Sequence, residues 1–463
     1  MQKFLIKNIH VVNEGTIKVA DVLIVNKRIE KLASNISVDY DVEEINGEGK
    51  YLLPGVIDDQ VHFREPGLTR KATIYTESKA AVAGGVTSFM EMPNTVPPVF
   101  TQVLLEEKYS IAAKSSLANY SFYMGTSNNN VEEVLKTNKK KKGVCGVKIF
   151  MGSSTGNLLV DDSFILEEIF GKCELPIATH CEDEKIIQRN MDQLTKERNV
   201  LSAEDHPLVR SEEACFTSSF KAVQLAKKHN SRLHVLHIST QNELQLFCND
   251  VPLDKKNITA EVCVHHLHFT SNEYKALGNL IKCNPAIKDP HHKEALWQGL
   301  LDGNLDVIAT DHAPHLLSEK RYVREKSGLF VSPPPLGEDG RGPAAAGIPL
   351  VQHGLLLMLR YYRLGRISLE KIVAKMCHAV ADCFQIQERG YIREGNFADL
   401  VIVDMNENTT VTKENILYKC GWSPFENETF PAAITHTFVN GHLVYKNGMF
   451  NESTIGRRLF FNR

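Results

Sequence analysis

The sequence predicts an α/β protein: a (β/α)8 barrel of the TIM type, joined to a small β-sandwich domain formed by both chain ends. Short apolar runs rich in β-branched residues alternate with amphipathic stretches of helical period, the pattern of consecutive parallel βαβ units. Eight such runs occur, the number that closes a barrel. The two ends of the chain instead carry short strand-like runs with turn signals such as Asn440-Gly441.

The expected barrel strands follow one another through the middle of the chain. Amphipathic stretches lie between most of them, for instance at residues 73–83, 211–228 and 292–301. Because each helix carries the chain back to the start of the next strand, we expect the strands to run parallel. The expected strands are residues 56–63, 86–92, 120–124, 147–150, 177–181, 233–238, 258–266 and 306–311.

The length of 463 residues suits a large barrel with a small satellite domain. We expect residues 1–53 to begin the β-domain, residues 54–385 to form the barrel, and residues 386–463 to complete the β-domain and end in a tail. One segment, residues 332–349, is biased toward Pro, Gly and Ala. Loops of this composition are either functional lids or inserts.

Composition narrows the class of partner. The net charge is -3, with lysine and arginine spread along the chain, so neither nucleic acid nor a membrane surface is an expected partner. Lys3 and Lys7 interrupt the first apolar run, and no apolar stretch is long enough to cross a bilayer. The ten cysteines include no C-x-x-C pair, which suits reduced thiols. We expect a cytoplasmic protein that acts on a small molecule.

Side chains that can bind metals fall at the carboxyl ends of the expected strands, where such barrels place their active sites. His62, His180 and Asp311 end the first, fifth and eighth strands. Lys148 lies in the fourth strand, and His237 lies near the end of the sixth. One histidine at a strand end is more often structural than a ligand, but five suitable residues together reverse that balance. Imidazole and carboxylate groups suit zinc and related divalent ions.

Short motifs are spread over most of the chain: PGVID at 54–58, MPNT at 92–95, VKIFMG at 147–152, HIST at 237–240, TDHAPH at 310–315 and GNFADLVIVD at 395–404. With these motifs the whole chain resembles the dihydroorotases, metal-dependent enzymes of the cyclic amidohydrolase superfamily. The resemblance implies that carbon dioxide carboxylates Lys148 and that the resulting carbamate bridges two metal ions. It also suggests a homodimer, because barrels of this family often pair.

The resemblance further implies a role for each of the other metal-binding candidates. His180 and His237 would hold one metal ion together with carboxylated Lys148, while His62, Asp311 and the same carbamate would hold the other. Zinc is the expected metal, although these ligands also permit cobalt or manganese. A metal-bound hydroxide would attack the ring of L-dihydroorotate and give N-carbamoyl-L-aspartate, with Asp311 as general acid and base. This reaction is reversible and belongs to de novo pyrimidine biosynthesis.

Gln60 departs from the family pattern, because it stands where the first imidazole of a His-x-His pair is expected. An amide oxygen is a poorer zinc ligand than imidazole, so the metal site at His62 and Asp311 should be weaker. Gln60 either coordinates through its oxygen, hydrogen-bonds a metal-bound water, or leaves that site empty. Asp59 is not expected to replace it, because alternation along a strand points Asp59 away from Gln60.

Arg64 indicates the class of substrate. It lies two residues beyond His62 on the same strand face, where its guanidinium can bind a carboxylate bidentately. By the resemblance, Asn94 and His315 contact the same carboxylate and Asn284 lies near the ring. Simpler readings are that Arg64 forms a surface ion pair, that Asn94 forms a turn, and that His315 starts a helix.

Two other functions remain open. A hydantoinase or allantoinase is the nearer one, although its ring substrate presents no carboxylate to Arg64. The more distant alternative is a non-catalytic relative that keeps the barrel. Gln60 supports this alternative, whereas the presence of the other metal-binding candidates argues against it. His265, His266 and His268 form a cluster to which the sequence assigns no role.

Overall fold

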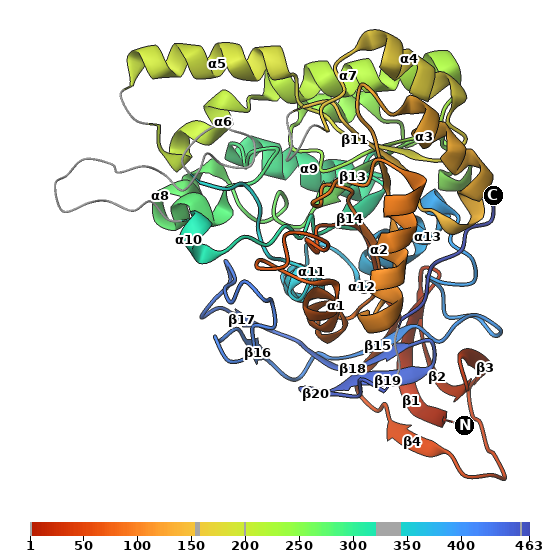
Figure 1. Cartoon of the computed structure of the whole chain (residues 1–463). Coiled ribbons are helices and arrows are strands. Elements are labelled where there is room, and N and C mark those ends of the chain that lie inside the picture. The colour runs from red at the N-terminus through yellow and green to blue at the C-terminus, as the bar shows by residue number, and fades with distance from the viewer. Residues whose placement is uncertain (1, 153–157, 199–200, 321–343, 454–455) are drawn as a thin grey trace.

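The computed structural model describes residues 2–152, 158–198, 201–320, 344–453 and 456–463. Parallel strands lie at its centre, and helices lie around them (Figure 1). The strands are β6 (Val56–Val61), β7 (Val86–Glu91), β8 (Asn119–Phe122), β9 (Met124–Gly125), β10 (Val147–Phe150), β11 (Ile177–His180), β12 (Leu233–Val235), β13 (Ile258–Cys263) and β14 (Val307–Ala309).

Hydrogen bonds close the ring between its first and last strands. β6, β7 and β8 form one parallel set, and β9 to β14 form another. Tyr123 alone separates β8 from β9, so the two occupy one strand position. On the other side, the peptide N–H of His62 donates to the carbonyl of His312 at 2.7 Å, beside a parallel bridge between Val61 and His312. The predicted eight-strand barrel is confirmed.

The helices begin and end where local chemistry favours it. α1 begins after Thr73, whose hydroxyl accepts a hydrogen bond from the peptide N–H of Thr76, and α7 begins after Ser211 in the same manner. Asn230, in the left-handed conformation, ends α7. The three example helices predicted from the sequence correspond to α1, α7 and α9. Within the described ranges, no helix combines the length and apolar character needed to cross a membrane.

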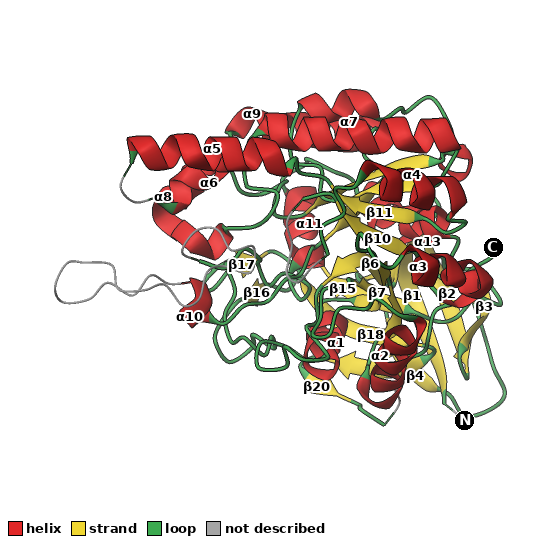
Figure 2. Cartoon of the chain, turned by 45° about the horizontal axis from the view of Figure 1, so that its top comes forward, coloured by secondary structure: helices red, strands yellow, loops and turns green. Residues whose placement is uncertain are grey.

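Figure 2 shows these helices packed around the strands, with α5 and α7 lying side by side. They are α1 (Ile74–Ala83), α2 (Gln102–Ser115), α3 (Val131–Lys136), α4 (Ser163–Lys172), α5 (Glu184–Glu197), α6 (His206–Val209), α7 (Glu212–His229), α8 (Tyr274–Leu277), α9 (Pro290–Asp302), α10 (Leu317–Lys320), α11 (Gly354–Arg363), α12 (Leu369–Val373) and α13 (Ala379–Phe384).

Strands from both chain ends meet in one nine-stranded sheet, in the order β20-β19-β18-β15-β5-β1-β2-β3, with β4 also paired to β1. The rings of Phe4 on β1 and Phe438 on β18 lie 5.2 Å apart, although β15 and β5 separate these strands in the sheet. The sheet therefore folds over its own apolar core, and the predicted β-domain from both ends is confirmed. The strands are β1 (Lys3–Asn13), β2 (Thr16–Val25), β3 (Arg28–Ala33), β4 (Glu43–Asn46), β5 (Tyr51–Pro54), β15 (Leu400–Asp404), β18 (Ala433–Val439), β19 (His442–Lys446) and β20 (Met449–Phe450).

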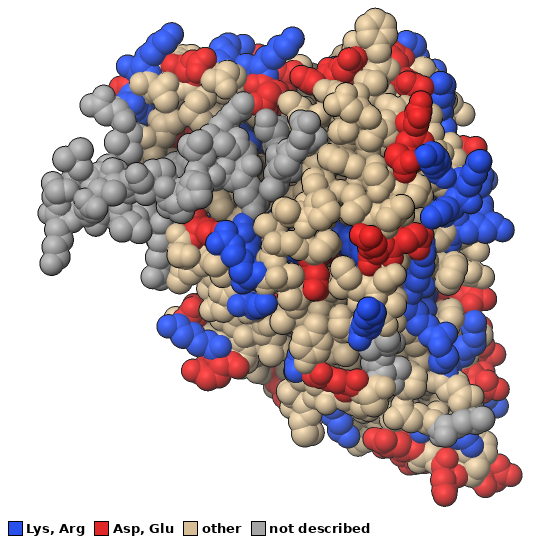
Figure 3. Space-filling model, in the orientation of Figure 1, with Lys and Arg blue, Asp and Glu red and all other residues tan. Residues whose placement is uncertain are grey.

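The domain boundaries at residues 53/54 and 385/386 stay predictions. β5 of the terminal sheet runs to Pro54, directly before β6 of the barrel. β16 (Thr409–Thr410) and β17 (Thr429–Phe430) form a separate pair outside that sheet. On the face drawn in Figure 3, basic and acidic side chains are interspersed over most of the surface, with Lys and Arg densest along the right-hand edge.

The side chain of Asp59 lies inside the barrel, although simple alternation along the strand would point it away from Gln60. The register of β6 against β7 shifts between Asp58 and Val61. The Asp59 carboxylate lies 3.0 Å from Nε2 of His234 on β12, and Glu261 on β13 lies 3.7 Å from the same nitrogen. Since β6 and β12 are not neighbours, these groups meet across the lumen. Burial opposes the charge on His234, yet hydrogen bonds to the two carboxylates raise its pKa to about 9.

Candidate active site

The expected metal-binding side chains converge at the carboxyl ends of the strands in two pairs. Nδ1 of His180 lies 3.0 Å from Nε2 of His237. Nε2 of His62 lies 3.2 Å from Oδ1 of Asp311. Lys148 lies close enough to interact electrostatically with both pairs. All five predicted residues therefore share one site.

Lys148 is a buried amine with the properties that carboxylation requires. It is 1% exposed, and its Nζ lies 4.6 Å from the centre of the Phe150 ring. No group among the described residues hydrogen-bonds Nζ. Burial lowers the pKa of Lys148 to about 7, so a large share of the amine is neutral at neutral pH. A neutral amine is the form that reacts with carbon dioxide.

His180 and His237 form the first half of the site. Burial lowers the pKa of both rings, so they are neutral at neutral pH and keep a lone pair for a metal. Nε2 of His180 lies 3.0 Å from Glu182, which also pairs with Arg210. This carboxylate orients the ring so that Nδ1 faces His237. The peptide N–H of His237 donates to Glu261 at 2.9 Å, and its Nδ1 has no hydrogen-bond partner within the described ranges.

His62, Gln60 and Asp311 form the second half. Nδ1 of His62 lies 2.7 Å from Oδ1 of Asn94, which leaves Nε2 facing Asp311. Burial lowers the pKa of His62 as well. The Gln60 amide donates from Nε2 to Oδ1 of Asp311 at 3.2 Å. Asn94 thus contacts a metal-ligand candidate, and Gln60 holds a carboxylate, a contact that sequence reasoning did not foresee.

Three site residues have left-handed backbone conformations, which non-glycine residues seldom adopt. The φ angles are 67° at Arg64, 39° at His237 and 46° at Asp311. Each such residue costs about 1–3 kcal/mol, and such residues cluster at functional sites. The turns at these strand ends direct the side chains to their places in the site.

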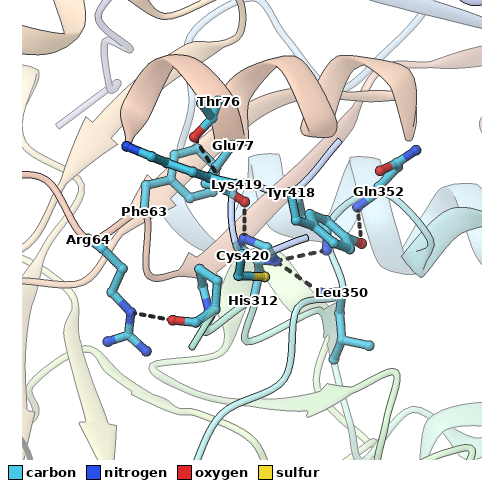
Figure 4. Close-up of polar contacts among 12 residues, drawn as sticks. Phe63, Arg64, Thr76, Glu77, His312, Leu350, Gln352, Tyr418, Lys419 and Cys420 are labelled. Atoms are coloured by element: carbon cyan, nitrogen blue, oxygen red, sulfur yellow. Dashed lines mark hydrogen bonds and ion pairs between the residues drawn. The ribbon is translucent and has the colours of Figure 1, made fainter. Parts of the chain in front are cut away.

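Arg64 and His315 lie together, as the resemblance to dihydroorotases implies. Nη2 of Arg64 lies 2.9 Å from Nε2 of His315, and Nε of Arg64 donates to the carbonyl of Pro314 at 3.2 Å, the contact shown at lower left in Figure 4. Lys71 lies 3.1 Å from Nδ1 of His315. Arg64 is only 2% exposed, so it does not lie on the surface. The Glu319 carboxylate lies 3.4 Å from both Lys71 and Nδ1 of His315 and balances part of this positive charge. The guanidinium of Arg64 is the group here that suits an anionic substrate.

Asn284 follows β13 and is half-buried. Its Oδ1 lies 3.0 Å from Nε2 of His206 on α6. Nearby, Lys282 donates from Nζ to the carbonyl of Ala344 at 2.7 Å. Residues 332–343 of the Pro/Gly/Ala-rich segment lie outside the described residues, so the role predicted for that loop stays a prediction.

A buried network that the sequence did not indicate holds the turn after β14 (Figure 4). Nε2 of His312 lies 2.8 Å from Glu77, and Nδ1 accepts the peptide N–H of Leu350 at 2.9 Å. Glu77 also accepts from the Thr76 hydroxyl at 2.9 Å and from the Lys419 peptide N–H at 3.1 Å. Because His312 follows Asp311 directly, these contacts fix the turn that carries the carboxylate.

The sequence profile of the Amidohydrolase family matches residues 51–444. The chain belongs to this family. A dihydroorotase from Methanosarcina acetivorans is 31% identical over 458 residues, covering 96% of this chain and 92% of that protein. A dihydroorotase from Carboxydothermus hydrogenoformans is 32% identical over 444 residues, covering 95% and 96%. The predicted resemblance to dihydroorotases is confirmed.

Solved structures show the same architecture. The L-hydantoinase (dihydropyrimidinase) from Arthrobacter aurescens matches this amidohydrolase with a TM-score of 0.87 and 25% identity, covering 97% of this chain and 98% of the other. The dihydropyrimidinase from Brevibacillus agri matches with a TM-score of 0.85 over 100% of both chains. At 23% identity this second likeness concerns the fold alone.

The family implies a metal cofactor, and the side chains of the site fit one. Three buried imidazoles of lowered pKa, a buried amine and a carboxylate converge on one space. Nζ of Lys148 and Nδ1 of His237 lack hydrogen-bond partners within the described part of the chain. Buried polar atoms without partners are costly, and a ligand would offset that cost.

Proposed function

We propose that this amidohydrolase is a dihydroorotase, which reversibly hydrolyses L-dihydroorotate to N-carbamoyl-L-aspartate in de novo pyrimidine biosynthesis. The observation that carries the proposal is the buried contact between Arg64 and His315 beside the metal-binding candidates. A ring substrate held by its own carboxylate at this corner would present a ring amide to the metal-binding side. The similar proteins named dihydroorotases support the same substrate.

We infer that zinc is the metal and that two ions bind. His180, His237 and the carbamate of Lys148 would hold one ion, while His62, Asp311 and the same carbamate would hold the other, more weakly because of Gln60. Bound there, divalent ions polarise a carbonyl and lower the pKa of water to about 7. Nζ of Lys148, neutral in a large share of molecules, would form the carbamate with carbon dioxide.

Asp311 would move the proton. Its carboxylate would take a proton from the attacking water and deliver it to the ring nitrogen as the carbon–nitrogen bond breaks. Gln60 and His62 both contact Oδ1 of Asp311, which fixes the orientation of the carboxylate. In the reverse direction, Asp311 would accept the nitrogen proton as the ring closes.

Arg64 would bind the substrate carboxylate through two parallel N–H bonds, and His315 would support it. Asn94 and Asn284 complete the substrate side in this proposal. Because Oδ1 of Asn94 faces His62, its amide NH2 is the group that would face the substrate. The cytoplasmic location stays a prediction, and the sequence leaves the oligomeric state open, with a homodimer as one option.

A hydantoinase is the second candidate, favoured by the likeness to the Arthrobacter aurescens structure. A substrate panel at equal metal loading separates the two: L-dihydroorotate, dihydrouracil and hydantoin. We expect L-dihydroorotate to give the highest kcat/KM, because only this ring carries a carboxylate for Arg64. Faster turnover of the uncharged rings would make the protein a hydantoinase. A folded, metal-loaded protein that is inactive on all three would support the non-catalytic alternative.

A further inference from the structure

Cys263 places a thiol beside the glutamine that replaces an expected imidazole. Its Sγ lies 3.8 Å from Oε1 of Gln60 and is fully buried. β14 separates β13, which ends at Cys263, from β6, so thiol and amide meet inside the barrel. Cys263 pairs in register with Ala309, two residues before Asp311. The thiol therefore borders the weaker half of the site.

Two buried histidines complete a donor cluster with this thiol. One ligand atom from each of Cys263, His265 and His266 lies within 4.8 Å of the others. His265 is 1% exposed, and neither of its ring nitrogens makes a hydrogen bond of ordinary geometry among the described residues. Burial lowers the pKa of this ring, and an interaction with the Thr310 backbone partly opposes that shift. Nε2 of His266 lies 3.1 Å from the carbonyl of Pro285, so that nitrogen carries the proton. Nδ1 of His266 keeps a lone pair and has no hydrogen-bond partner in the described ranges.

We propose that Cys263 and His265, with Nδ1 of His266, form a thiolate–imidazole binding position for a zinc-like ion beside Gln60. The thiolate and the imidazoles at this position replace the imidazole donor that is missing at Gln60. The inference rests on the proposed metal-dependent function and deepens it by naming ligands outside the expected set. A thiolate with imidazoles selects zinc or cobalt over magnesium or calcium.

Metal binding at this position requires the thiol to lose its proton. Burial raises the pKa of Cys263, so the thiol is neutral until a cation binds. Its hydrogen bond to Oε1 of Glu261, at 3.3 Å, provides an acceptor for the proton as the metal–sulfur bond forms. A cysteine that only packed in the hydrophobic core would need no polar neighbours, yet Gln60, Glu261 and two imidazoles surround Cys263.

The direct test uses cobalt. Metal-stripped protein is loaded with Co²⁺ and bicarbonate without substrate, and its near-ultraviolet spectrum is recorded. We expect a thiolate-to-cobalt charge-transfer band that Cys263→Ser abolishes. The matched control is Cys173→Ser, because that buried thiol packs in the hydrophobic core and donates a hydrogen bond to the carbonyl of Leu175, at 3.7 Å. A parent protein that binds cobalt without the band, or a band that survives in Cys263→Ser, overturns the proposal.

A second series keeps the proposal testable if Cys263→Ser does not fold. We expect His265→Asn to weaken the second zinc equivalent at least about tenfold in a chelator competition. His268→Asn is its control, because His268 bonds to Tyr361 at 3.0 Å outside the cluster. Adding Gln60→His to Cys263→Ser or His265→Asn should restore the affinity. Unchanged affinity in His265→Asn contradicts the proposal.

Both series are read without substrate, so they fail independently of the proposed function. If the protein shows the charge-transfer band but does not turn over L-dihydroorotate, the proposed ligands stand and the proposed reaction is wrong. If the protein turns over L-dihydroorotate but Cys263→Ser does not change its cobalt spectrum, the proposed reaction stands and the proposed ligands are wrong.

Discussion

The two halves of the site differ in the number of imidazoles that they offer to a metal ion. On one side, His180 and His237 lie 3.0 Å apart, and Glu182 orients the first ring. On the other side, a glutamine amide donates a hydrogen bond to Asp311 where a second imidazole is expected. The difference indicates that the first half offers two imidazoles to a metal ion, whereas in the second half the Gln60 amide orients the Asp311 carboxylate.

The buried carboxylates beside the two halves, Glu182 and Glu91, also differ in their pKa values. Burial would raise the pKa of Glu182, but the charge of Arg210 lowers it to about 2. Burial raises the pKa of Glu91 to about 7 despite Lys108 at 3.1 Å. Glu91 accepts the peptide N–H of Phe63 at 2.9 Å, directly beyond His62. The support behind the first half stays charged, while the support behind the second titrates near neutral pH.

Asp311→Asn should give the largest effect. We expect kcat for L-dihydroorotate to fall about 10²–10⁴-fold, because the carboxylate that moves the proton is gone. The first half should still retain about one metal equivalent by elemental analysis, since its ligands are untouched. His180→Asn is the opposite control and should lose that equivalent. A protein that lost all metal in Asp311→Asn would show that the halves are not separable.

Arg64→Met should act on the substrate rather than on either metal. Loss of a charged hydrogen-bonding partner costs about 1.5–3 kcal/mol, which lowers kcat/KM for L-dihydroorotate about 10–100-fold. Turnover of hydantoin should be nearly unchanged, because it carries no carboxylate. Steady-state kinetics on both substrates with matched metal content checks this. Equal losses on the two rings would refute the assigned role.

Glu182→Gln and Gln60→His should change the two halves in opposite ways. The first removes the charge that orients His180 and should weaken the tighter zinc equivalent about 10-fold or more. The second restores an imidazole and should tighten the weaker equivalent by a similar factor. Calorimetric zinc titrations of both variants should therefore bring the two affinities closer together. If either variant shifted the other equivalent instead, the ions would be assigned to the wrong halves.

Glu91→Gln should remove a pH dependence of stability. The folded pKa of Glu91, about 7, exceeds its ordinary value of 4.5, so the stabilisation is complete below pH 4.5 and lost as pH rises through 7. We expect this group to lower the free energy of unfolding by about 2–3 kcal/mol between pH 5 and pH 8. Urea unfolding at both pH values measures it. A parent and a variant with the same pH slope would contradict the shifted pKa.

The sequence predicted the barrel and the convergence on one site because strand ends can be read from periodicity. Their positions at the ends of the fifth and sixth strands placed His180 and His237 at one face of the barrel, and the resemblance implied that they pair. Arg64 and His315 met as the resemblance implied. These successes share one cause: the carboxyl ends of parallel strands meet at one face of the barrel.

Contacts that depend on local irregularity could not be predicted. The register shift in β6 turned Asp59 into the lumen toward His234, against simple alternation. The hydrogen bonds from His62 to Asn94 and from Gln60 to Asp311 depend on side-chain rotation that no spacing encodes. Glu182 and Arg210 are distant in sequence, and only packing brings them together behind His180.

The most direct test is a zinc titration of metal-stripped protein in bicarbonate, followed by bound zinc and by L-dihydroorotate turnover in the same samples. We predict two equivalents of unequal affinity, with turnover that is absent from the stripped protein and rises as zinc binds. Turnover that ignored added zinc, or no turnover in folded protein at saturating zinc, would contradict a metal-dependent dihydroorotase with one strong and one weak half.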